Sequence, residues 1–238
     1  MNTLTATAGS ARESNKDLLI PYVAPYLAFV AIASLLGGYL TFEWNYVLRL
    51  LFVVPLLIFY WRSYVPLRGP KSPLISGLAG AFTGILGTVM WVVLVKPFAP
   101  SEGVHWSQAG LGLRLATAGL VVPVFEELLM RGYVLRLVLQ WDLLRKAGAE
   151  DAFGKAFHDS SIEQVEAGSW TLAAVVISTV VFALGHQVRE WPAALAYGLL
   201  MAALWINRKD LLSCVVAHGV TNIALTLYIW NTKQWGIW

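Results

Sequence analysis

Residues 124–136 read Val-Phe-Glu-Glu-Leu-Leu-Met-Arg-Gly-Tyr-Val-Leu-Arg and place Glu126, Glu127 and Arg131 in the middle of an otherwise apolar run. A charged side chain at the centre of a bilayer costs about 2.5–3.5 kcal/mol on insertion scales. Three such charges therefore either pair with one another for packing or line a wet cavity and perform chemistry. Glu127 and Arg131 stand at i and i+4 with the acid first, which is the favoured order for a helical ion pair. Glu126 has no basic residue at i±3 or i±4.

The composition is that of a membrane protein. Of 238 residues, 58% are hydrophobic and only 13% are charged, whereas a soluble domain carries about 25% charged residues. The mean hydropathy is +0.63. The net charge of +3 follows the usual excess of Lys and Arg beside spans and does not indicate a nucleic-acid partner. The single cysteine, Cys214, excludes an internal disulfide and lies in an apolar run, as expected for a buried structural thiol.

Apolar segments predict an all-α polytopic fold of about seven transmembrane helices that enclose a polar cavity, since a span needs about 20 apolar residues. The first segment is too long for the core of a cleaved signal peptide. The third carries four glycines near one helical face, which predicts close packing against another helix; they are Gly77, Gly80, Gly84 and Gly87. The expected spans are residues 18–40, 46–61, 74–95, 109–136, 169–187, 192–206 and 211–230. One transmembrane domain, 18–230, would then lie between a polar tail, 1–17, and a short C-terminal tail, 231–238.

The distribution of basic residues predicts the orientation. With the N-terminus in the cytoplasm, eleven Lys and Arg residues fall in inside segments and three in outside segments, which is a positive-inside bias. Arg49 and Arg114 stand near outer span ends, where they can snorkel to the interface, so neither is assigned a function. The longest polar segment, Trp141–Gly168, has apolar residues at helical spacing and predicts an interfacial helix.

Few polar groups remain at depth, and they fall on three predicted spans. Phe182 and His186 stand at i and i+4, as do His218 and Asn222, so each pair shares one helical face. Exposing such faces to lipid would be expensive. We therefore expect the three polar faces to point at one another around a cavity.

Three motifs in this order resemble those of the CPBP family, which includes the type II CAAX prenyl endopeptidases and the abortive-infection membrane proteins. They are Glu-Glu-x-x-x-Arg at 126–131, Phe-x-x-x-His at 182–186 and His-x-x-x-Asn at 218–222. The resemblance covers residues 109–230, the motif core. In overall character the chain also resembles the branch found beside bacterial exosortase protein-sorting systems.

The resemblance implies a glutamate intramembrane endopeptidase that needs neither a metal nor another cofactor. Glu126 would activate the hydrolytic water with help from His186, and His218 and Asn222 would stabilise the oxyanion. Glu127, Arg131 and Phe182 would support these residues structurally. The implied setting is a bacterial inner (cytoplasmic) membrane. The implied partners are the lipid bilayer, a membrane-anchored protein or peptide substrate and a protein-sorting system.

Other functions remain open on the residues alone. A zinc peptidase could use Glu126, His186 and His218 as ligands, although no His-Glu-x-x-His helix is present. A non-catalytic scaffold or immunity protein, or a proton-coupled transporter, could also bury such groups. A serine peptidase is disfavoured because the chain has no Gly-x-Ser-x-Gly motif.

The expected depths of the motif residues disagree. Glu126 lies about 15 Å from the inner span end at Arg136, whereas His186 lies only about 5 Å from Arg189 at the predicted outer end. These positions differ by about 10 Å in depth. Either Arg189 and Glu190 lie inside a cavity because the helix ends deeper than predicted, or a span is miscounted.

Overall fold

The computed structural model describes residues 13–237, which form helices and connecting loops without a β-strand. Residues 1–12 of the predicted polar tail, and Trp238 of the predicted C-terminal tail, lie outside the described residues. The first helix already begins at Asn15, because the Ser14 hydroxyl accepts from the Asp17 N–H and the Asp17 carboxylate accepts from the Ser14 N–H. The prediction of an all-α protein is confirmed.

Each predicted span coincides with a helix or a continuous helical segment. The fourth segment is helical from Gln108 to Lys146, but π-helical turns interrupt it at Thr117–Val121 and Leu128–Val134. The helices are α1 (Asn15–Leu36), α2 (Phe42–Phe59), α3 (Pro73–Val95), α4 (Gln108–Ala116), α5 (Val122–Glu127), α6 (Leu135–Lys146), α7 (Ala152–Gly154), α8 (Leu172–Leu184), α9 (Trp191–Arg208) and α10 (Leu211–Thr232).

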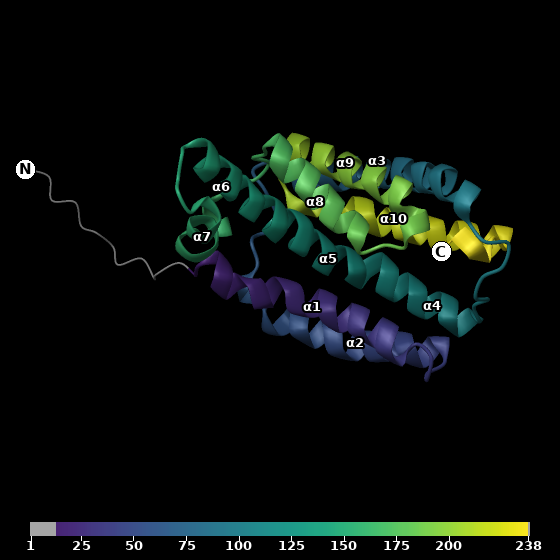
Figure 1. Ribbon diagram of the computed structural model, residues 1–238. Coiled ribbons are helices and arrows are strands. Elements are labelled where there is room, and N and C mark those ends of the chain that lie inside the picture. Colours follow the sequence, from purple (N-terminus) through teal and green to yellow (C-terminus); the bar gives the residue numbers. More distant parts are fainter. Residues whose placement is uncertain (1–12, 238) are drawn as a thin grey trace, which may run out of the picture.

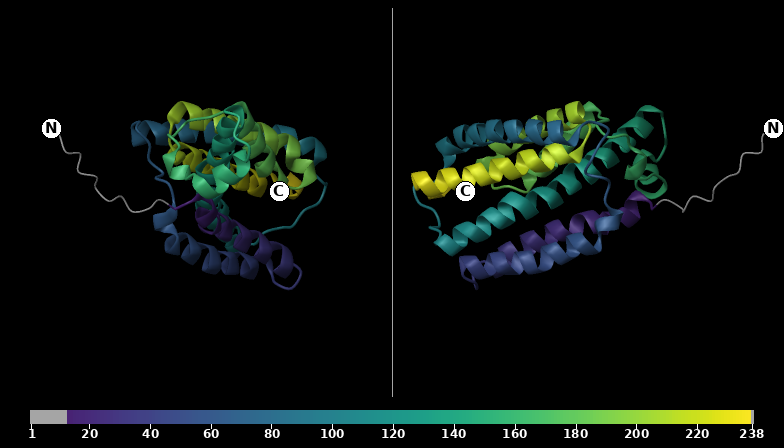
Figure 2. Two further views of the ribbon diagram at one scale, coloured as in Figure 1. Left: turned by 60° about the vertical axis from the view of Figure 1, so that its left-hand side comes forward. Right: turned by 180° about the vertical axis from the view of Figure 1, so that it is seen from behind.

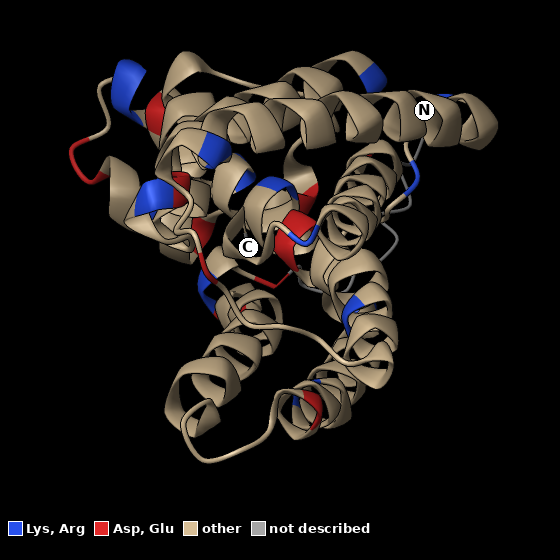
Figure 3. Ribbon diagram, turned by 90° about the vertical axis from the view of Figure 1, so that its right-hand side faces the viewer, with Lys and Arg blue, Asp and Glu red and all other residues tan. Residues whose placement is uncertain are grey.

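Four of these helices are long and apolar enough to cross a membrane: α1, α2, α3 with its extension to Phe98, and α10. Most of the helical ribbon carries no charged residue (Figure 3). The chain is therefore an integral membrane protein. α8 has only 13 residues, or about 20 Å of helix, which is shorter than a hydrocarbon core of about 30 Å. The count of seven spans stays a prediction.

The helices form one elongated bundle around the continuous α4–α6 segment. The α1–α2 hairpin packs along one side of this segment, and α3, α8, α9 and α10 lie along the other (Figure 1). The view from behind shows the same order, with the described chain beginning at one end of the bundle and α10 finishing at the other (Figure 2). The region predicted as an interfacial helix folds as α7 and a π-helical turn, Lys155–Asp159. Its Ala156 carbonyl accepts from the Asn15 side chain at the start of α1.

The hairpin of α8 and α9 is shorter than its neighbours, and its turn lies part-way along the bundle instead of at the bundle end (Figure 1). α8 stops at Leu184, and a 3-10 turn, Val188–Glu190, leads directly into α9. Glu190 is buried. This geometry explains the mismatch in the predicted depths, because α8 carries Phe182 but ends before His186, deeper than its apolar sequence suggested.

The glycine face of α3 allows a close approach to α10. A Cβ on Gly80 would lie 2.6 Å from the Ser213 carbonyl oxygen, and one on Gly84 would lie 2.6 Å from the Ala217 carbonyl oxygen. Gly87 is similarly close to Tyr197 of α9. Gly77 differs, because a Cβ there would meet no atom within 4 Å. Three of the four predicted contact glycines therefore serve close packing, and Gly77 does not.

Candidate active site

Glu126 and Glu127 are neighbours in α5, between the two π-helical turns. Successive helical residues point about 100° apart, so the two carboxylates face different surroundings. Glu127 is fully buried within the bundle, whereas Glu126 lines a cavity. π-helical turns are rare and often occur at functional sites, and here they flank both acids.

Glu127 and Arg131 form a buried salt bridge with an Nη1–Oε2 distance of 3.2 Å. Arg131 also donates from Nη2 to the Gly198 carbonyl of α9 at 3.1 Å, and its guanidinium lies 5.6 Å from the centroid of the Phe182 ring of α8. The pair thus links the helix of the two acids to the short α8–α9 hairpin, and it lies behind the cavity wall, not on it.

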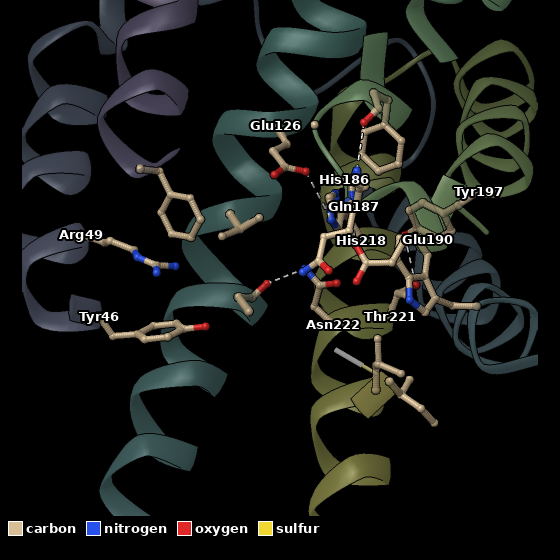
Figure 4. A pocket seen from close by; sticks show the side chains of 18 residues that line it. Tyr46, Arg49, Glu126, His186, Gln187, Glu190, Tyr197, His218, Thr221 and Asn222 are labelled. Atoms are coloured by element: carbon tan, nitrogen blue, oxygen red, sulfur yellow. Dashed lines mark hydrogen bonds and ion pairs between the residues drawn. The ribbon is translucent and has the colours of Figure 1, made fainter. Parts of the chain in front are cut away.

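His218 of α10 lies between the two acids. Its Nδ1 is 2.9 Å from Oε1 of Glu127, and its Nε2 is 3.8 Å from Oε2 of Glu126. A carboxylate accepts hydrogen bonds, so Nδ1 is the donor to Glu127. This bond fixes the ring so that Nε2 faces Glu126 and the cavity, an arrangement that Figure 4 shows.

His186 enters the same cavity from the α8–α9 turn. Its Nδ1 is 2.9 Å from the Phe182 carbonyl oxygen. A carbonyl can only accept, so Nδ1 carries the proton and the lone pair of the neutral ring is on Nε2. The ring packs against Phe182 and Trp91 at centroid distances of 4.6 and 5.4 Å, and Trp191 Nε1 donates to the His186 carbonyl at 3.2 Å. These contacts fix its orientation.

Asn222 lies one turn after His218 on α10, and its Nδ2 donates to the Ala118 carbonyl at 2.8 Å. The π-helical turn explains why this carbonyl needs a partner. The Val122 N–H bonds to the Thr117 carbonyl, and the next residue, Pro123, has no N–H. Ala118 therefore lacks a donor in its own helix, and the Asn222 amide supplies one.

One cavity of about 260 Å³ brings together Glu126, His186, His218 and Asn222. Phe182, Trp91, Tyr197 and Thr221 complete the nearby wall. The Tyr197 hydroxyl donates to Thr221 at 3.0 Å, and Thr221 in turn donates to the Gly84 carbonyl. The wall beside the four residues is therefore held by hydrogen bonds among α3, α9 and α10.

Two charged residues that were not among the predicted site residues also line this cavity: Arg49 of α2 and Glu190 of the α8–α9 turn. For Glu190, the mismatch between the predicted depths of His186 and Glu126 had already indicated a place inside a cavity. No sequence signal distinguished Arg49 from a snorkelling arginine, because its place in the cavity depends on how α2 packs. For Arg114 the snorkelling prediction is wrong, since it is only 5% exposed and its guanidinium lies 4.3 Å from the centroid of the Trp106 ring.

Within residues 13–237, no group of three or more His, Cys, Asp or Glu side chains is arranged to hold a metal ion. The donor geometry therefore does not favour Glu126, His186 and His218 as a zinc-ligand set.

Residues 108–224 match the protein family described as type II CAAX prenyl endopeptidase Rce1-like. This region is a CAAX-protease-like domain. It begins with α4 and ends within α10, so it contains all three motifs, whereas α1, α2 and α3 precede it. Neither a curated protein nor a solved structure matches the chain.

Proposed function

We propose that the protein is an intramembrane endopeptidase that hydrolyses a peptide bond of a membrane-anchored protein with a water molecule activated by Glu126, independently of a metal ion. One observation carries the proposal. Side chains from α5, the α8–α9 turn and α10 converge on a single cavity, and Glu126 is an acid there without a lysine or arginine partner among residues 13–237. The CAAX-protease-like domain supports peptidase chemistry in general.

Glu126 would act as the general base. Its carboxylate takes a proton from water while the water oxygen bonds to the carbonyl carbon, which gives a tetrahedral oxyanion. The same carboxyl group then gives that proton to the amide nitrogen as the C–N bond breaks. The lone pair on Nε2 of His186 would accept a hydrogen bond from the water and help to orient it. A positioned base of this kind contributes about 10²–10⁴-fold to a rate.

His218 and Asn222 would stabilise the oxyanion. One N–H of the Asn222 amide is bound to Ala118, and the other is left for the substrate. For His218 to donate from Nε2, its ring must carry both protons, and the carboxylate of Glu127, which also pairs with Arg131, would help to stabilise that charge through Nδ1. Donors of this kind are each worth about 10²–10³ in rate.

The substrate would be a protein held in or on the bilayer, because the cavity is part of a membrane-embedded bundle. We further propose a bacterial cytoplasmic membrane with the N-terminus inside, on the basis of the positive-inside bias. A protein-sorting system is the proposed context, by the resemblance of the whole chain to the exosortase-associated branch.

The test compares membrane proteomes of the native host carrying wild type, Glu126→Gln or Glu163→Gln. Glu163 is exposed and is not part of the cavity wall, so its variant is a matched control. We expect at least one membrane protein to accumulate uncleaved only with Glu126→Gln. Identical protein termini in all three strains would refute the proposal and favour a non-catalytic scaffold. Loss of cleavage by the wild type on treatment with a chelator, restored by zinc, would refute the metal-independent mechanism alone.

A further inference from the structure

Arg49 is a cation on the opposite side of the cavity from the motif residues. It projects from α2, and Figure 4 shows its guanidinium and the Tyr46 hydroxyl facing the side of the cavity that carries Glu126, His218 and Asn222. α2 precedes the CAAX-protease-like domain, so this wall comes from a part of the chain that the family match does not cover.

No carboxylate of residues 13–237 forms a salt bridge with Arg49. Its guanidinium instead lies against two aromatic rings, 4.7 Å from the centroids of both Phe29 and Tyr46. Its Nε is buried without a hydrogen-bond partner. Arg131, by contrast, is neutralised by Glu127. Aromatic faces attract a cation but do not use the directional donors of a guanidinium. Besides its hydrogen bond with the Tyr46 side chain, the Arg49 guanidinium, which has five N–H donors, retains donors for an anionic ligand.

Glu190 does not neutralise Arg49, although it lines the same cavity. Its Oε2 accepts from the Gln187 N–H at 3.2 Å, and its Oε1 is 3.9 Å from Arg189. Glu190 is thus bonded within its own turn. The cavity therefore holds acids on the α5 and α8–α9 sides and an arginine without an acidic partner on the α2 side.

We propose that Arg49 binds a carboxylate of the peptide substrate and so sets which way the peptide lies in the cavity. A guanidinium presents paired donors that match a carboxylate. Glu126 repels the same carboxylate, so the substrate acid is held on the α2 side while the peptide bond lies beside Glu126. The carboxylate belongs either to the substrate's C-terminus or to an acidic side chain. This inference rests on the proposed function only in naming a peptide as the ligand.

The test uses purified full-length protein in nanodiscs and a degenerate library of apolar decapeptides in three forms. One form has a free C-terminal carboxylate, the second has a C-terminal amide, and the third has the amide with one internal Asp or Glu at varied positions. Binding is measured by retention on immobilised Glu126→Gln protein, and cleavage by mass spectrometry on protein with Glu126 intact. Each assay compares Arg49→Gln, Arg49→Lys and Arg68→Gln; Arg68 is exposed and is not part of the cavity wall.

Retention of one carboxylate-bearing form should exceed retention of the plain amide, and Arg49→Gln should remove about a 10- to 100-fold preference. Arg49→Lys should keep part of it, and Arg68→Gln all of it. Preference for the free acid identifies a terminal carboxylate, and preference for the internal acid identifies a side chain. Equal retention of all forms, or an unchanged preference in Arg49→Gln, overturns the proposal. Retention that depends on Arg49, together with identical protein termini in the host strains with and without Glu126→Gln, would uphold this subsite and reject the peptidase function.

Discussion

Glu127 contacts both Arg131 and His218. The salt bridge with Arg131 neutralises its charge, and the hydrogen bond with His218 fixes the orientation of the imidazole ring. We expect Arg131→Met to destabilise the protein by about 3–5 kcal/mol, because removing one partner of a buried pair leaves the other charge uncompensated. Thermal unfolding in detergent checks this expectation. Arg68→Met, at an exposed position, should change stability by less than about 0.5 kcal/mol.

The double variant Glu127→Gln, Arg131→Met separates a charge effect from a packing effect. It removes both charges and should recover part of the stability that Arg131→Met loses, since replacing a whole buried pair is often close to neutral. A double variant less stable than Arg131→Met would show that Arg131 contributes mainly through its contacts with Phe182 and Gly198.

At the scale of one helix, the π-helical turn before α5 leaves a backbone carbonyl that a residue of the site satisfies. Pro123 has no N–H to bond to the Ala118 carbonyl, and the Asn222 side-chain amide donates to this carbonyl instead. Asn222→Ala should therefore cost about 1–3 kcal/mol through an unsatisfied buried carbonyl. In a Pro123→Ala background the restored N–H can serve the free carbonyl, so the same change should cost about 1 kcal/mol less. A double-mutant cycle on unfolding free energies measures this coupling, and strict additivity would contradict it.

The α3–α10 contact makes a second prediction at the scale of helices. Gly84→Ala places a Cβ 2.6 Å from the Ala217 carbonyl oxygen and 2.7 Å from Val220 Cβ, so α3 and α10 must separate at a cost of about 1–3 kcal/mol. Gly77→Ala is the matched control, because its Cβ meets no atom within 4 Å. Its effect on the melting temperature should be near zero or slightly stabilising. Equal losses in both variants would show that helix propensity, not contact, governs this face.

For the whole molecule, the sequence predicted the helical class and the helix positions because apolar length and helical spacing are local properties. It also predicted that Glu126, His186, His218 and Asn222 face a common cavity, where the structure brings them together; their catalytic roles stay a prediction. It left open whether α8 ends early or a span was miscounted, since only the packing of the α8–α9 turn decides between the two. The sequence also did not predict that Arg49 lines the cavity. The position of Arg49 depends on how α2 packs against the other helices, which local sequence patterns do not show.

The topology of the chain depends on whether the α4–α6 segment crosses the membrane. If it does, the loop after α3 and the loop before α8 lie on opposite sides. Its charges would be costly in lipid, but Glu127 and Arg131 are buried within the bundle and Glu126 faces the cavity, so the segment can span. We expect a membrane-impermeant maleimide to label Ser101→Cys, before this segment, in right-side-out vesicles, and to label Glu150→Cys, after it, only once the vesicles are permeabilised. The native Cys214 is fully buried and should give no background. Labelling of both positions from one side would show that the segment does not cross, and the reverse pattern would place the N-terminus outside.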